Sequence, residues 1–74
     1  MKLWLLDRVA PHIGYDEIAG FVMRARDEEQ ARYFASQNAA EEGRDQWLEP
    51  SKSTCVELTA KGGPGIVLTD FRAG

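Results

Sequence analysis

The fold of this chain is decided at residues 21–37, FVMRARDEEQARYFASQ. Among the first five residues, Phe21, Met23 and Ala25 recur at every second position, a period of two that predicts a strand. Beyond them the apolar residues recur at a spacing close to 3.6, which predicts a helix. Asp27 stands between the two patterns as a helix N-cap, and Gln30, three residues later, completes a pair that resembles a capping box. The sequence therefore predicts a strand that passes directly into a helix.

The strand half of this segment has one face that is consistently apolar. Successive side chains of a strand point to opposite faces, so Phe21, Met23 and Ala25 share a face. We assign these three residues to the core. Val22 and Arg24 share the opposite face, which the alternation predicts to be the exposed one.

The helix half is predicted over residues 28–42, with Gly43 as its C-terminal stop. Its apolar stripe is narrow and rich in alanine, which suits close packing on a sheet. Glu28 and Arg32 stand four residues apart and are predicted to form an ion pair on the outer surface of the helix. The stripe consists of Ala31, Phe34, Ala35 and Ala39.

Three other stretches have the composition of strands. They are residues 2–9, 54–59 and 66–71, and the glycine-rich turn at 61–65 is predicted to join the last two as a hairpin. Residues 44–53 are predicted to be a connection. The resulting order is β-β-α-β-β. We predict an α+β fold in which one helix packs on one face of a four-stranded, mainly antiparallel sheet.

A single helix covers only one face of such a sheet, and the other face is left open. Open apolar sheet faces are docking surfaces more often than accidents, and twofold homodimers are the commonest soluble oligomers. We therefore expect a homodimer. The residues predicted for the open face are Trp4, Leu6, Val22, Val67 and Phe71.

Length and composition restrict the class of protein. The chain has 74 residues, which predicts one domain spanning residues 1–74 with a thin core. The net charge of −3 argues against nonspecific nucleic-acid binding. The apolar run near the start, LWLL, is too short for a signal peptide or a membrane span, so we expect a cytoplasmic protein.

Few side chains suggest chemistry. Cys55 is the only cysteine and His12 the only histidine, which excludes an internal disulfide and argues against a structural zinc site. In a predicted strand, Cys55 reads as a small buried hydrophobe. The GGPG sequence at 62–65 lacks the lysine of a phosphate-binding loop and precedes a predicted strand, so it reads as a hairpin turn. We expect a protein that is not an enzyme and needs no cofactor or metal.

The charge distribution is the most informative chemical feature. Residues 27–49 contain seven acidic and two basic side chains, a net charge of −5. The pattern predicts an acidic surface along the helix and the loop after it, either as an ordinary solvated face or as a patch that attracts a basic partner. The acidic residues are Asp27, Glu28, Glu29, Glu41, Glu42, Asp45 and Glu49.

Several stretches together resemble a family of small phage and prophage proteins. The stretches are KLWLL, YDEIAGFVMRA followed by DEEQAR, WLEPSKSTC and GIVLTDFRAG, which cover nearly the whole chain. The resemblance brings no assigned activity and no site residues with it. The matching positions are Tyr15, Asp16, Gly20, Phe21, Val22, Trp47, Leu48, Pro50, Cys55, Gly65, Ile66, Asp70 and Phe71.

The resemblance implies a protein that acts by binding. Small, acidic phage-encoded domains often bind a host protein, and anti-CRISPR and other anti-defence proteins form one such class. The leading hypothesis is a non-enzymatic inhibitor of a host defence complex in the bacterial cytoplasm, whose acidic surface meets a basic nucleic-acid-binding groove. One alternative is a phage accessory or regulatory protein that works through protein contacts. Another is a dimer that sequesters a small nucleotide, with Arg24, Arg26 and Lys52 at the phosphates.

Overall fold

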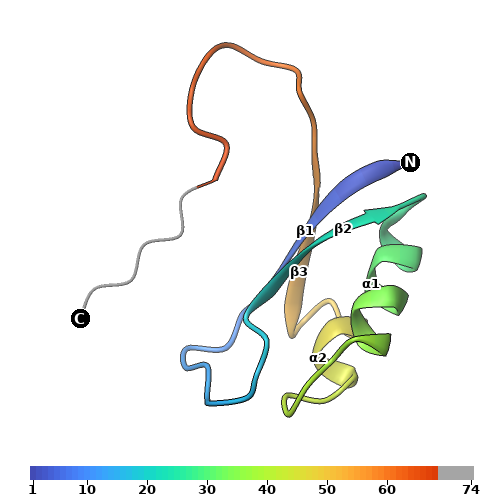
Figure 1. Cartoon of the computed structure of the whole chain (residues 1–74), viewed down its shortest axis with the longest axis vertical. Helices are drawn as coiled ribbons and strands as arrows, with labels where there is room; N and C mark the ends of the chain where they lie inside the picture. Colours follow the sequence, from blue (N-terminus) through green and yellow to red (C-terminus); the bar gives the residue numbers. More distant parts are fainter. Residues whose placement is uncertain (69–74) are drawn as a thin grey trace.

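A computed structural model describes residues 1–68 as one sheet with two helices on one of its faces (Figure 1). The sheet has three strands in the order β2-β1-β3, and both neighbouring pairs are antiparallel. The α+β class, the antiparallel sheet and the main helix were predicted from the sequence. The elements are β1 (Lys2–Arg8), β2 (Gly20–Ala25), α1 (Glu28–Gln37), α2 (Asp45–Leu48) and β3 (Ser53–Leu58).

The predicted fourth strand is not part of this sheet within the described residues. Residues 59–68 leave the end of β3 and arc away from the body (Figure 1), and Ile66 and Val67 are 84% and 74% exposed. The glycine-rich stretch does bend the chain, because Gly62 has a φ of 128°. A turn sets where a chain bends, but a strand also needs an edge to pair with, and the bend here does not return the chain to β3. The remainder of the predicted strand, residues 69–71, lies outside the described part.

The junction between β2 and α1 matches its prediction. The side chain of Asp27 accepts a hydrogen bond from the backbone N–H of Gln30 at 2.8 Å, and the Gln30 side chain accepts one from the N–H of Arg26 at 2.7 Å. The Asp27 bond satisfies one of the backbone donors that a helix start leaves free, and the Gln30 side chain reaches one residue further back than in a capping box, to Arg26 instead of Asp27. The two bonds fix the direction in which α1 leaves the sheet.

Helix α1 ends at Gln37, five residues before its predicted end. The side-chain amide of Asn38 donates to the carbonyl oxygen of Phe34 at 2.8 Å, while its backbone N–H turns to the carbonyl of Ala35. The oxygen that a continuing helix would offer to the Asn38 backbone is thereby occupied. Gly43, the predicted stop, lies in the following turn with a φ of 89°.

The core lies between the sheet and the helices. It is made of five fully buried side chains, and the ring of Phe21 meets that of Trp47 edge to face at a centroid distance of 4.9 Å. Trp47 comes from α2, a short helix inside the stretch predicted to be an irregular connection. The core residues are Leu6, Ala25, Ala31, Ala35 and Trp47.

Two residues predicted for the open face lie on the covered face instead. Leu6 is fully buried, and its cross-strand neighbours are Phe21 on β2 and Cys55 on β3. Trp4 packs against the same core and donates from its indole to the carbonyl of Ala25 at 3.1 Å. Since both faces of residues 2–9 are apolar, the sequence alone could not tell which one the helix covers.

A buried arginine ties the helices to the sheet. Arg32 is 7% exposed, and its guanidinium donates to the carbonyl of Trp47 at 3.0 Å, and to the hydroxyl and carbonyl of Ser53 at 2.8 and 3.0 Å. Its Nε donates to Glu28 at 2.9 Å. The predicted ion pair therefore forms, but Arg32 lies inside the protein rather than on the outer surface.

We expect Arg32→Met to destabilise the protein by roughly 3 kcal/mol or more, because buried acceptors on Trp47 and Ser53 would lose their donor. Urea unfolding followed by circular dichroism measures the change. Arg44→Met is the matched control, since Arg44 is exposed. Equal stability of the two variants would contradict this role of Arg32.

Candidate functional site

The uncovered face of the sheet carries a continuous apolar surface. Its middle row places Leu5 of β1 between Val22 of β2 and Val56 of β3. The next row places Leu3 beside Leu58. Val22 and Val56 are 55% and 56% exposed, which is unusual for valines in the middle of strands. We call these residues the open face; they are Leu3, Leu5, Val22, Val56 and Leu58.

Opposite charges lie at the two ends of the open face. Arg24 pairs across the strands with Leu3, and Asp7 lies four residues further along β1. Among residues 1–68, neither side chain takes part in an ion pair. Gly20 is the cross-strand neighbour of Asp7, and the Asp7 carboxylate lies over it, 2.7 Å from where a Cβ would be. The face is therefore apolar in its middle and charged, with opposite signs, at its ends.

Only one of the residues predicted for this face is part of it. Val22 lies in the middle row, as expected. Val67 is exposed but belongs to the segment that leaves the sheet, and Phe71 lies outside the described residues. The sequence prediction missed the other four members, Leu3, Leu5, Val56 and Leu58. The alternation of side chains along residues 2–9 and 54–59 could have identified them.

The predicted acidic residues lie in two groups rather than on one surface. The first group, Asp27 to Glu29, opens α1, and the second follows the end of α1. A ten-residue helix spans about 15 Å, which separates the groups. The second group consists of Glu41, Glu42, Asp45 and Glu49.

Contacts within the chain occupy most of the first group. The N–H of Gln30, and then the Arg26 guanidinium, hold the pKa of Asp27 below its usual range. Glu28 pairs with Arg32 at 2.9 Å. Glu29 is exposed and makes no ion pair within residues 1–68. The group therefore offers a partner little free charge beyond Glu29.

Glu42 is a structural residue rather than a free surface charge. Its carboxylate accepts hydrogen bonds from the backbone N–H of Ile18 at 3.0 Å, from that of Ala40 at 3.1 Å and from the indole of Trp47 at 2.7 Å. Burial raises the pKa of Glu42, but these hydrogen bonds outweigh it and leave the pKa below its usual value. Glu42 thereby joins the loop before β2 to α2.

The other members of the second group are exposed. Glu49 lies 3.5 Å from the ammonium group of Lys52. Glu41 and Asp45 make no ion pair in the part of the chain that the structure describes. Glu29, Glu41 and Asp45 are therefore the acidic side chains of residues 27–49 that remain available to a partner.

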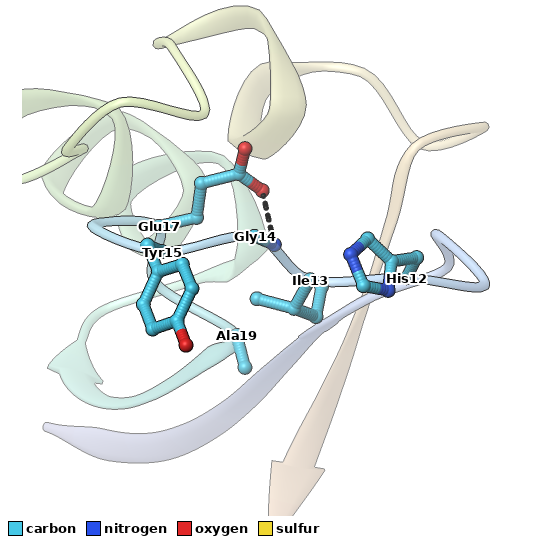
Figure 2. Close-up of a pocket in the computed structure, with 6 residues that line it drawn as sticks. All are labelled: His12, Ile13, Gly14, Tyr15, Glu17 and Ala19. Atoms are coloured by element: carbon cyan, nitrogen blue, oxygen red, sulfur yellow. Dashed lines mark hydrogen bonds between the residues drawn. The ribbon is translucent and has the colours of Figure 1, made fainter.

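The loop between β1 and β2 forms a shallow, open hollow (Figure 2). Glu17 turns back onto this loop, where its carboxylate accepts from Arg8 at 2.8 Å and from the N–H of Gly14 at 3.2 Å. These two bonds, the one from Arg8 first, hold the pKa of Glu17 below its usual range. His12 and Tyr15 also line the hollow, and Tyr15 is 99% exposed. The carboxylate of Glu17 is thus engaged by the loop and by the end of β1.

The remaining candidates for chemistry stay apart. Cys55 packs against the core on β3, and burial, then the nearby Glu28 carboxylate, raises the pKa of its thiol. A raised pKa keeps the sulfur protonated and weakly nucleophilic. Within residues 1–68, no three His, Cys, Asp or Glu side chains are grouped as metal ligands would be.

The three basic residues considered for a nucleotide do not converge. Arg24 lies at one end of the sheet, whereas the carbonyl of Lys52 accepts from Val9, beyond the other end of β1. The side chains of Arg26 and Lys52 pair with neighbouring acids. The described residues therefore show no common phosphate site for them.

Comparisons with protein-family models, with curated proteins and with solved structures give no match. No helix among residues 1–68 is long and apolar enough to span a bilayer.

We expect Glu42→Gln to lower the free energy of unfolding at pH 7 by about 1–3 kcal/mol, because a neutral amide accepts hydrogen bonds less strongly. Since folding lowers the pKa of Glu42, its contribution is complete above the ordinary glutamate pKa of about 4.3 and is lost as the pH falls through the lower value of the folded state.

The difference in the free energy of unfolding between the wild type and Glu42→Gln should therefore be smaller at acid pH. Urea unfolding at pH 7 and near pH 3 measures this difference. Glu41→Gln is the matched control, because the neighbouring Glu41 is exposed. A difference that stays the same at both pH values would contradict this account.

Proposed function

We propose that this chain is a small non-enzymatic binding protein that works as a homodimer, with the open face of one copy covered by that of another. The observation that carries the proposal is a row of aliphatic side chains, Val22, Leu5 and Val56, across an uncovered three-stranded sheet. Removing apolar surface of this kind from water contributes roughly 25 cal/mol for each Å², which must exceed the entropy lost when two chains associate. In the free monomer, this apolar surface stays in contact with water, which is unfavourable.

The chemistry of the described side chains supports a binding role rather than catalysis. Glu17 and Glu42, the carboxylates in the most protected positions, have lowered pKa values and accept hydrogen bonds that hold the fold. A general acid at neutral pH would need the opposite shift. The thiol of Cys55, with its raised pKa, is equally unsuited to nucleophilic attack.

A second copy is a better match for the open face than a membrane or a nucleic acid. The face is aliphatic and bounded by one positive and one negative side chain, Arg24 and Asp7. Nucleic acids and anionic lipids require a surplus of positive charge, which this face lacks. A self-complementary patch is what a twofold interface requires.

We expect Val56→Glu to disrupt the dimer while leaving the monomer folded. Val56 is 56% exposed in the monomer, so a carboxylate costs little there, but it would be desolvated in the dimer. Sedimentation equilibrium or light scattering over micromolar concentrations should show about twice the monomer mass for the wild type and the monomer mass for the variant.

Tyr33→Glu is the control, because Tyr33 is 52% exposed on α1, on the helix side of the molecule. It should remain dimeric. A wild-type chain that is monomeric throughout this concentration range would overturn the proposed dimer.

The acidic residues favour a second, more specific function. We propose that Glu29, Glu41 and Asp45 attract a basic protein surface, as an inhibitor of a host defence complex would when it meets a nucleic-acid-binding groove. The support is that these three are exposed and make no ion pair within residues 1–68, whereas Glu28 and Glu42 are engaged internally. This is the role that the resemblance to phage and prophage proteins implies.

Replacement of Glu29, Glu41 and Asp45 by lysine should abolish such inhibition and leave the fold intact. A plaque assay in bacteria with and without the defence system measures it. Glu57→Lys is the control outside both acidic groups, and it should inhibit like the wild type. If the wild-type protein protects phage in neither host, the inhibitor hypothesis is wrong. The alternative, a phage accessory protein that acts only through protein contacts, would then remain.

A further inference from the structure

We infer that the two copies pack with their β1 strands antiparallel, so that Arg24 of each copy pairs with Asp7 of the other. The inference rests on the proposed homodimer and specifies its geometry. The two charges lie at opposite ends of one apolar face, since Arg24 shares a row with Leu3 and Asp7 shares a row with Gly20.

When two stacked sheets pack with their strands aligned, the twofold axis between them runs close to the strand direction or close to the direction across the strands. With the axis along the strands, equal ends of the two β1 strands meet, and Asp7 faces the same residue of the other copy. With the axis across the strands, the Asp7 end of one copy lies over the Leu3 end of the other. Only the second arrangement brings opposite charges together, and like charges at an interface oppose association.

Leu5 marks the centre of this arrangement. It lies midway between Leu3 and Asp7 on β1, which is the central strand, so an axis across the strands passes beside it. Each row then meets a defined row of the other copy. The middle row, with Val22 and Val56, meets itself and forms the apolar centre, while the row of Leu3 meets the row of Asp7.

Gly20 lets the Asp7 carboxylate lie at the place where Arg24 of the other copy arrives. When β2 of one copy lies over β2 of the other, Arg24 falls opposite Gly20. A Cβ at Gly20 would lie 2.7 Å from Oδ1 of Asp7 and 2.8 Å from the carbonyl oxygen of Leu6, so the carboxylate of Asp7 already lies over this glycine. Aligned sheets pack about 10 Å apart, a distance that an arginine and an aspartate side chain can bridge together. A side chain at position 20 would displace the Asp7 carboxylate from this place.

Twofold symmetry makes the charge pairing occur twice. Each single substitution therefore removes two ion pairs and creates two contacts between like charges. We expect Arg24→Asp and Asp7→Arg each to raise the dimer dissociation constant roughly tenfold or more. Exchanging the charges in the double variant Asp7→Arg with Arg24→Asp restores both pairs, so its dissociation constant should return to within about threefold of the wild type.

The experiment is sedimentation velocity on the full chain at low and high salt, with circular dichroism to confirm that each variant is folded. The effect of each single substitution should shrink at high salt, because the pairs lie at the rim. Glu57→Arg is the control, since Glu57 lies on the other face of the sheet in the row of Trp4.

The outcomes separate this inference from the proposal beneath it. A dimeric wild type whose dissociation constant is unchanged by the single substitutions, or whose double variant is weaker than either single one, overturns the antiparallel pairing and leaves the dimer standing. Stronger association of Arg24→Asp also overturns it. A wild type that is monomeric at every concentration overturns both.

Discussion

The structure depends on one buried arginine. Arg32 extends from α1 and donates to Trp47 on α2 and to Ser53 at the start of β3, so it joins three elements that follow one another in the sequence. The hydroxyl of Ser53 must point toward the helix to be reached. That orientation fixes the alternation of the whole strand, with Cys55 inward and Val56 outward.

The open face is thus a consequence of how the covered face is held. Leu6 faces inward beside Phe21, whose ring meets Trp47, and α1 and α2 together fill only this side of the sheet (Figure 1). Both helices of residues 1–68 lie on this side, and no further helix or strand of that range packs on the other face. Among the described residues, the outward aliphatic side chains are therefore left exposed, as Val22 and Val56 show.

The acidic residues show that composition and location carry different information. The net charge of −5 over residues 27–49 is a property of the sequence, but its members have unequal roles. Asp27 begins a helix, Glu28 balances Arg32, and Glu42 joins a loop to α2. A carboxylate that accepts such hydrogen bonds stabilises the fold and is no longer free for a partner. The remaining free charge is both smaller and more divided than the sequence suggested.

Sequence patterns were most informative where local chemistry decides the structure. The change of period at residues 21–37, with Asp27 as the cap, predicted the strand, the helix start and the inward face of β2, because each depends on neighbours a few residues away. The end of α1 was predicted too late, since Asn38 competes for the carbonyl of Phe34 before Gly43 is reached. The capping ability of an asparagine is visible in a sequence, but whether it acts is not.

By itself, then, the sequence determined an antiparallel α+β fold, the direct passage from β2 into α1 and the inward set of Phe21, Met23 and Ala25. Only the tertiary structure decided which face of β1 is covered. That choice depends on Trp47 and Ser53, contacts more than fourteen residues from Arg32 along the chain. The periodicity of a strand shows which residues share a face. Contacts with residues distant in the sequence determine which of the two faces is buried.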